Sequence, residues 1–492
     1  MYTHSMSLAR FIGICSAICS LTLATHSDQP FMQKLLSLDD CLKIGIERNS
    51  TLQIMEINLA SSLADIQIAS SIYDSRLQLN GTWQDSELPP GSFPSDGGVE
   101  RGQFGGRLYR GLPIGVQVGL EVDVQRNLFE GMGFPANPAW RTAVGITLKV
   151  PVWKNAFGAT DRAFIESFRR RQLSRQFEFA RSRELVGAQI VQQYWNAAAA
   201  RKVAESQGLL VERLSLLLDD NRKKAEEGLL DESAVLAVDA ALALAEVDRV
   251  TLLNDVAFQD EKLKDLINIP ARDWDVVFID YGFEPSLPGI SHDLGFMDVY
   301  EQALRDRADL EAIKSEIARL DTLIRMRRLD NRADVELSGS IGRGDSDTRW
   351  NETLDFDKNL WSLGVAVDLS LDRSDTAGRL AQAYLEREAL RVEMESLERT
   401  IALECRSSVR EVDISRRLLQ ATRRALDAQE RKLALETQRF DRGQSAIQVL
   451  IDYENDRDLA ARDHQRAWTT YKQAEALLRL ALGEGLRMGG SP

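Results

Sequence analysis

Two stretches of this chain occur twice, and the duplication limits the possible folds more than any other feature. Residues 42–83 align without gaps with residues 300–341, and residues 228–268 align in the same way with residues 443–483. The aligned pairs include Leu52 with Leu310, Ala60 with Ala318, Ile66 with Ile324, and Val235 with Leu450. Each half therefore runs helix, strands, long helix, turn, helix. This order predicts one domain with internal two-fold pseudo-repetition.

The repeat predicts the organisation of the whole chain. We expect a first repeat over 36–269 and a second over 298–485. A linker at 270–297 would join them, and a C-terminal tail would occupy 486–492.

The twelve prolines leave two long stretches of the chain without proline. No proline lies between Pro151 and Pro270, and none lies between Pro288 and Pro492. Proline inside a helix costs about 3 kcal/mol. These stretches, rich in Ala, Leu, Glu and Arg, therefore predict two sets of long helices, with the longest over about 162–226 and 375–440.

Glycines and apolar spacing give the expected ends and packing of these helices. Gly228 and Gly443 stand at matched places after the two long helices, where glycine ends a helix in the left-handed conformation. Apolar residues in the second long helix are spaced by four or three, as in a coiled coil. They are Leu390, Met394, Leu397, Ile401 and Cys405.

Several short stretches alternate between apolar and polar residues. In 116–124 every second residue is Val or Leu, and the residues between them are Gln, Gly, Glu and Asp. Residues 146–152, 335–338 and 363–371 show the same pattern. Alternation predicts a half-buried sheet, which a soluble sandwich would also explain. Strands of this kind with charged inner faces also suit an outer-membrane barrel, apolar outside and wet inside.

The number of strands decides whether one chain could close such a barrel. We expect two strands from each repeat and so four per chain, whereas about eight is the practical minimum for a barrel. Three chains would share a barrel of twelve strands. Segment 104–125 is left open: it extends the first strand through a bend, or it forms an outer hairpin. The polar, Gly-rich stretches 89–106, 131–137 and 342–358 are expected as outer loops.

The N-terminus predicts export from the cytoplasm. Arg10 precedes an apolar run that is too short to span a bilayer and ends in small residues near Ala24. We therefore expect residues 1–24 to be a signal peptide, with a buried N-terminal helix as the alternative. Acylation of Cys19 is not expected, because Ile18 before it is not small. No other run of about 20 apolar residues predicts a transmembrane helix.

Composition excludes several classes of function. The net charge is −14, from 61 basic and 75 acidic residues, and this disfavours nucleic acid as the main partner. Beyond the signal, the scattered His292, His464, Cys41 and Cys405 have neither metal-ligand spacing nor a nucleophile–base arrangement. We expect no enzyme, no cofactor and no metal site. Burial of Cys41 and Cys405 is favoured over a disulfide between them.

Two further segments resemble a known family. One is the strand-to-helix junction VPVWKNAFGATDR at 150–162. The other segment contains an Arg, a Gly four residues later, two aliphatic residues followed by an Asp, and a helical stretch that ends with a Leu and a Gly. Here these are Arg439, Gly443, Leu450-Ile451-Asp452, Leu478 and Gly483. With the paired helix starts, they resemble the TolC family of outer-membrane efflux proteins. The chain departs from the family pattern at Val449, Ser370 and Ala237.

The resemblance implies an α+β fold in which long antiparallel coiled-coil helices form an α-helical barrel. It implies a homotrimer that shares one β-barrel in lipid of the cell outer membrane and extends through the periplasm. There it would meet a membrane-fusion adaptor and an inner-membrane pump. The implied function is a passive channel-tunnel of a tripartite efflux or type I secretion complex. The alternative is a secreted or periplasmic coiled-coil scaffold without channel activity, which leaves the alternating strands unexplained.

The resemblance also implies roles for residues near the two helix turns. Gly228 and Gly443 would lie at the periplasmic tip, and Asp452 would lie two to three helical turns further in. Three copies would place three Asp452 carboxylates around an aperture that favours cations, unless Asp452 is an ordinary solvated acid. Arg439 and Arg442 would hold neighbouring helices closed or contact the adaptor, or be solvated arginines.

Overall fold

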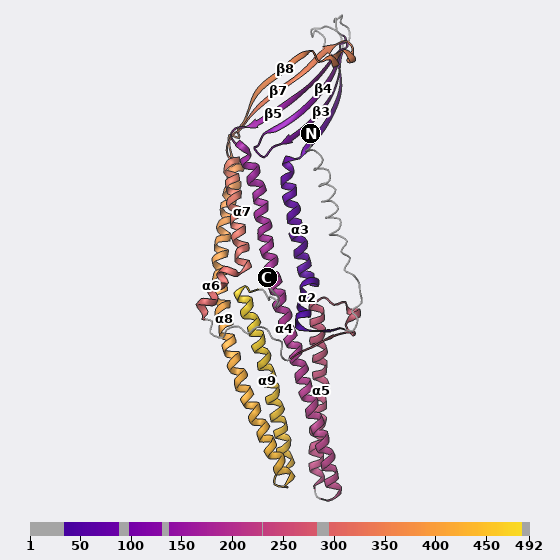
Figure 1. Ribbon diagram of the computed structural model, residues 1–492, viewed down its shortest axis with the longest axis vertical. Helices are drawn as coiled ribbons and strands as arrows, with labels where there is room; N and C mark the ends of the chain where they lie inside the picture. Colours follow the sequence, from indigo (N-terminus) through magenta and orange to yellow (C-terminus); the bar gives the residue numbers. More distant parts are fainter. Residues whose placement is uncertain (1–33, 88–97, 130–136, 229, 283–294, 485–492) are drawn as a thin grey trace, which may run out of the picture. The chain divides into compact units, whose positions relative to one another are not determined.

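The computed structural model describes residues 34–87, 98–129, 137–228, 230–282 and 295–484 (Figure 1). The expected signal peptide, the C-terminal tail and much of the linker lie outside the described residues. The chain divides into two compact units. The helical unit comprises Met1–Leu52, Arg183–Asp298 and Arg406–Pro492, and the sheet unit comprises Gln53–Ser182 and Val299–Cys405. Within the described ranges, no helix combines the length and the apolar character needed to cross a bilayer.

Two pairs of long helices occupy the proline-free stretches, as predicted. Helices α4 (Ala159–Glu226) and α8 (Ser374–Asp441) have 68 residues each. At 1.5 Å per residue each is about 100 Å long. After a short turn, α4 is followed by α5 (Glu232–Leu266) and α8 by α9 (Ile447–Leu482).

The described elements repeat in the order that the sequence predicts. Helices α3 (Ser50–Ser70) and α7 (Ala308–Asp330) each precede a strand, and Leu52 and Leu310 are both third in their helix. Val235 and Leu450 are likewise both fourth in α5 and α9. Because residues in register occupy the same place in paired elements, the duplication is structural. The exact repeat limits stay a prediction.

The core of the helical unit forms around close contacts of α4. Helix α2 (Leu38–Arg48) begins with a capping box between Ser37 and Asp40, and its Gly45 leaves no room for a Cβ beside the Ile190 side chain. Strands β1 (Lys34–Leu36) and β6 (Val277–Ile279) pair in parallel. The fully buried Trp195 of α4 packs edge-on against Trp468, with ring centroids 4.7 Å apart.

Both cysteines in the described chain are buried free thiols, as the composition favoured. Burial, with the nearby Asp40 and Asp260 carboxylates, raises the pKa of Cys41 to about 12. The thiol therefore stays protonated and packs as a small apolar side chain.

One antiparallel sheet dominates the sheet unit, and it corrects the expectation of four strands per chain. Its order is β2-β3-β4-β5-β7-β8, six strands, of which the first repeat supplies four (Figure 1). The strands are β2 (Ser75–Glu87), β3 (Gly98–Gly111), β4 (Gln117–Phe129), β5 (Ala139–Pro151), β7 (Asp334–Asp347) and β8 (Lys358–Asp368).

The open segment 104–125 is a hairpin inserted between β2 and β5, and it does not extend the first strand through a bend. It contributes the second half of β3 and most of β4. The expected loop 89–106 is wrong from Gly98 onward, because β3 already begins there. The expected loop 342–358 is also too long, since β7 continues to Asp347. In both places glycines interrupt the apolar alternation that marks a strand.

Two short helices complete the sheet unit and its connection to the helical unit. Helix α6 (Phe296–Asp306) precedes α7, and Arg307 stands between them. A 3₁₀ segment of about two turns, Trp350–Asp355, lies between β7 and β8. Its buried Thr353 hydroxyl is 2.7 Å from the Thr142 hydroxyl of β5.

Candidate functional site

Glycine ends both long helices at the places that the sequence predicts. Gly228 has φ of 74° and Gly443 has φ of 73°. After α8, the Gln444 N–H donates to the Arg439 carbonyl and the Gly443 N–H donates to the Phe440 carbonyl, both at 2.9 Å. This is a Schellman motif with Gly443 in the left-handed position.

The α4–α5 turn and the α8–α9 turn lie at one end of the helical unit, which we call the tip (Figure 1). A contact between the two long helices joins them there, because the Lys224 ammonium lies 5.3 Å from the centre of the Phe440 ring. Behind the turns, Leu218, Val238 and Ile451 form a buried apolar cluster from α4, α5 and α9.

The two predicted tip arginines are both on the surface of a single copy. The Arg439 guanidinium lies 3.5 Å from the carboxylate of Glu436, one turn earlier in the same helix. Glu436 is buried and also accepts a hydrogen bond from the Ser445 hydroxyl, which fastens the turn to α8. Arg442 is exposed. Contact of either arginine with a neighbouring copy or an adaptor stays a prediction.

Asp452 lies on an exposed stripe of α9. Its carboxylate accepts a hydrogen bond of 3.0 Å from the Gln448 amide, one turn earlier. Gln448, Asn455 and Leu459 are exposed on the same side of the helix, whereas the adjacent Ile451 is buried. The helix contacts within one chain therefore leave the Asp452 carboxylate uncovered, so it is accessible to a solute or to another copy.

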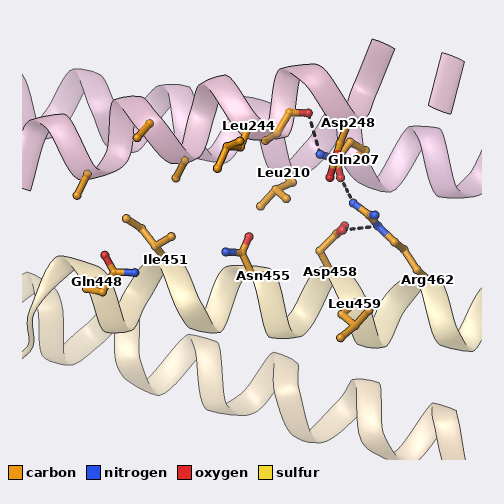
Figure 2. Close-up of a pocket in the computed structure, with 14 residues that line it drawn as sticks. Gln207, Leu210, Leu244, Asp248, Gln448, Ile451, Asn455, Asp458, Leu459 and Arg462 are labelled. Carbon is orange, nitrogen blue, oxygen red and sulfur yellow. Dashed lines mark hydrogen bonds and ion pairs between the residues drawn. The ribbon is translucent and has the colours of Figure 1, made fainter. Parts of the chain in front are cut away.

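Gln448, Asn455 and Leu459 also line a groove of about 550 Å³, which runs between α5 and α9 over a floor from α4 (Figure 2). Asp452 is not among its lining residues. Small and aliphatic side chains line most of it, including Ala237, Ala241 and Leu244 of α5 and Leu210 of α4. The small alanine side chains leave room for this groove between the helices.

A polar cluster closes one end of the groove (Figure 2). The Arg462 guanidinium lies 2.6 Å from the carboxylate of Asp458, which is only 2% exposed. Asp458 also accepts a 2.8 Å hydrogen bond from Ser206 of α4. Since each buried charge faces an opposite charge or a hydrogen-bond donor, the cluster avoids the cost of an unpaired ion.

Gln207 extends this cluster to the third helix. Its amide donates to the Ala245 carbonyl of α5 at 2.8 Å and accepts from Arg462. The cluster therefore ties α4, α5 and α9 together and sets their relative rotation. Sequence reasoning missed it, although Asp458 and Arg462 have the four-residue spacing of an ion pair along a helix. That spacing is common on solvated helix faces, so it did not stand out.

The strand register places apolar side chains on a single face of the six-stranded sheet. Leu79 on β2, Leu120 on β4, Ile146 on β5 and Leu363 on β8 belong to this face and are 63%, 47%, 54% and 78% exposed. Exposed apolar areas of this extent mark contact with a protein or a membrane.

The opposite face of the sheet is polar. It carries Arg107, Glu121, Asp123, Arg141, Lys149 and Glu336. Gln103 of β3 donates to the Asp123 carboxylate of β4 at 2.8 Å, and Lys149 of β5 lies 3.2 Å from Glu336 of β7. One face thus suits lipid and the other suits water. Among the described residues, no group of three His, Cys, Asp or Glu side chains is arranged to hold a metal ion.

Comparison with known proteins agrees with this architecture. Residues 299–484 match the family model described as outer membrane efflux protein. No curated protein matches the chain.

Solved structures match the fold over nearly the whole chain. The outer-membrane channel OprN has a TM-score of 0.68 and 16% identity, covering 91% of this chain and 90% of its own. The CmeC outer membrane channel of Campylobacter jejuni has a TM-score of 0.68 and 14% identity, with coverages of 91% and 86%. VceC, an outer membrane protein of Vibrio cholerae, has a TM-score of 0.66 and 14% identity, with coverages of 92% and 97%.

The matched family consists of channels and not enzymes, and both the family and the fold support an outer-membrane efflux channel. Residues 299–484 are therefore similar to outer membrane efflux proteins, and the chain has the fold of outer-membrane channels of the TolC type.

Proposed function

We propose that three copies of this chain assemble in the outer membrane into one channel-tunnel, through which solutes leave the cell passively. The observation that carries the proposal is the two-faced sheet, which is apolar on one side and polar on the other across all six strands. A bilayer covers the apolar side, and a water-filled lumen hydrates the polar side.

The sheet edges explain why several copies are needed. Strands β2 and β8 each have only one neighbour in the sheet, so each presents a row of unpaired backbone groups. Backbone groups facing lipid must be paired, because an unsatisfied group there costs several kcal/mol. Six strands are also fewer than the smallest practical barrel. Pairing the β8 edge of one copy with the β2 edge of the next satisfies both requirements.

The long helices would continue the duct into the periplasm. In this proposal the tip, at Gly228 and Gly443, docks on a periplasmic membrane-fusion adaptor, and an inner-membrane pump supplies the energy. The exposed Arg442 and Arg439 side chains offer positive charge for that contact. The complex would serve tripartite efflux or type I secretion.

Asp452 would form the narrow part of the duct. Its carboxylate is exposed and lies on the stripe of α9 that the contacts with α4 and α5 leave uncovered. Three such carboxylates around the axis would attract cations and repel anions.

Membrane fractionation and electrophoresis without boiling test the assembly. We expect a detergent-dependent trimer in the outer-membrane fraction that dissociates to a single chain on heating. Reconstituted into planar bilayers, the unboiled species should conduct ions, and the boiled species should not. A soluble monomer without conductance would contradict the proposal and favour the coiled-coil scaffold.

A further inference from the structure

We propose that the β3–β4 hairpin is part of the barrel wall, so that each copy contributes six strands and three copies enclose a lumen of eighteen. This inference rests on the proposed trimeric channel. With six strands, the barrel segment of each copy is half as wide again as a segment of four strands would be.

Backbone pairing integrates the hairpin into the sheet on both sides. Strand β3 pairs with β2 from Ser75↔Arg110 to Glu87↔Gly98. Strand β4 pairs with β5 from Gln117↔Lys149 to Asn127↔Ala139. No direct pairing of β2 with β5 occurs in the described sheet. Folding the hairpin out of the wall would therefore break two complete ladders.

The hairpin also has the two faces that a barrel wall requires. Phe104 and Leu108 of β3 and Leu120 and Val122 of β4 continue the apolar face from Leu77 and Leu79 on β2 to Ile146 on β5. Arg107, Glu121 and Asp123 lie on the polar face. If the hairpin lay in water outside the wall, this apolar side would remain exposed to solvent, which is unusual for an apolar area of this extent.

An aromatic row crosses the hairpin at the end of the apolar face. The register aligns Trp83 of β2, Gly102 of β3, Arg126 of β4 and Trp140 of β5. The Arg126 guanidinium lies 5.4 Å from the Trp83 ring centre and 5.9 Å from that of Trp140. Aromatic side chains of this kind gather where a barrel meets the membrane–water interface. Because Arg126 joins two tryptophans from flanking strands, the row places the hairpin at the same depth as β2 and β5.

The turn of the hairpin is held at the other end of the sheet. Residues 112–116 form this turn, and the Pro113 carbonyl accepts a 3.1 Å hydrogen bond from Arg162 at the start of α4. Gly115, with φ of 80°, packs so closely that a Cβ there would lie 2.7 Å from the Gly158 nitrogen. The turn is thereby fixed to the strand-to-helix junction that β5 also enters.

Strand direction permits closure with this count. All neighbours in the sheet are antiparallel, so β2 and β8 run in opposite directions. The β8 edge of one copy can then pair antiparallel with the β2 edge of the next. An even, fully antiparallel barrel results, as outer-membrane barrels require.

The strand count sets the width of the lumen. With strands about 4.8 Å apart and tilted by about 40°, eighteen strands give a backbone diameter of about 36 Å, against about 24 Å for twelve. The membrane segment would then not be the narrowest part of the duct. Selection among solutes would fall to the tip, and the barrel would pass solutes bulkier than a twelve-stranded wall admits.

Paired variants, each with one added cysteine, test whether the hairpin lies in the wall of the assembled trimer. Leu120→Cys and Glu121→Cys probe the two faces of β4, and Ile146→Cys and Thr147→Cys are matched controls on β5, where Ile146 pairs with Leu120. The buried Cys41 and Cys405 should not react, because the label cannot reach them. Each site carries a nitroxide spin label, and collision with oxygen reports lipid whereas collision with a water-soluble nickel chelate reports water.

We expect oxygen collisions to dominate at 120 and 146 and nickel collisions to dominate at 121 and 147. If both β4 labels meet nickel while the β5 labels still alternate, the hairpin lies outside the wall. That result would overturn this inference and leave the channel standing. If the β5 labels do not alternate either, the sheet does not meet lipid, and both proposals fail.

Electron cryo-microscopy of the detergent-solubilised trimer gives an independent reading without substitutions. A closed wall of eighteen strands about 36 Å across would support the inference. A closed wall of twelve strands in the same trimer would overturn it while retaining the proposed channel.

Discussion

At the scale of single residues, charge pairing decides which ionic groups are structural. Arg307, only 2% exposed, lies between α6 and α7 and contacts Asp309 at 2.6 Å and Glu404 at 2.5 Å. Burial acts to raise the pKa of Asp309, but hydrogen bonds and charge from Arg307, with Arg181 nearby, lower it overall. Asp309 is therefore held ionised by a buried partner. By contrast, the Asp452 carboxylate accepts a hydrogen bond from an amide in its own helix and is exposed in the described part of the chain, which leaves it available for function.

Substitution of Arg307 should show how much the fold depends on the ion pair between Arg307 and Asp309. Arg307→Met leaves the Asp309 carboxylate partly buried without its main partner, so we expect a loss of about 3–5 kcal/mol in the free energy of unfolding. The exposed Arg305→Met is the matched control and should change it by less than about 0.5 kcal/mol. Urea denaturation in detergent measures both variants.

The pH dependence of the same variant follows from the lowered pKa of Asp309. A carboxylate with a depressed folded-state pKa stabilises the fold above its unfolded pKa, and this contribution disappears as pH falls through the folded-state value. The stability gap between wild type and Arg307→Met should therefore narrow below about pH 4. A gap that stays constant from pH 7 to pH 3 would show that lost packing, and not charge, causes the defect.

The proposed aperture role of Asp452 predicts a change in ion selectivity. Asp452→Asn removes the charge and keeps the size, so the ratio of potassium to chloride permeability should fall severalfold, measured from reversal potentials across a salt gradient. Asp463→Asn is a matched control on the same helix, since Asp463 is also exposed but lies three turns further from the tip. Equal ratios for wild type and Asp452→Asn would contradict the aperture role without affecting the channel itself.

At the scale of elements, local backbone chemistry determines where the long helices stop. Gly443 takes a left-handed conformation that costs other residues about 1 kcal/mol, and the Schellman hydrogen bonds require it there. Helix α4, by comparison, runs straight through Gly208, which has no positive φ and sits in its interior. The same residue type therefore ends one helix and merely weakens another.

Alanine at these two glycines should have opposite effects. At neither position does an atom beyond the adjoining backbone lie within 4 Å of where the new Cβ would be, so backbone conformation decides the outcome. Gly443→Ala should lower the free energy of unfolding by about 1 kcal/mol, and Gly208→Ala should raise it by about 0.5–1 kcal/mol. Thermal unfolding of the two variants side by side checks the signs. A stabilising Gly443→Ala would show that the turn does not need the left-handed conformation.

At the scale of the whole molecule, the sheet explains why a single copy is incomplete. Its apolar side chains remain exposed, as Trp361 does at 79%, and its edge strands β2 and β8 lack a second neighbour. Assembly of three copies in a membrane would cover the apolar side chains with lipid and would pair the edge strands with each other.

Much of this architecture could be predicted from local patterns. The absence of proline from 152–269 and from 289–491 marked the long helices, Gly228 and Gly443 marked their ends, and alternation marked β4, β5, β7 and β8. Strand β3 could not be predicted in this way, because five glycines interrupt its alternation. Its place in the sheet comes from backbone pairing with β2 and β4.

The sequence by itself determined the helices, their ends, the duplication and the apolar and polar sides of most strands, because each depends on residues close together in the chain. Only the tertiary structure decided that the sheet has six strands, that Asp458 is buried against Arg462, and that Asp452 stays exposed. These depend on hydrogen bonds and contacts between residues far apart in sequence, such as Ser206 with Asp458. No local pattern encodes which of two similar helix acids meets a partner from another helix.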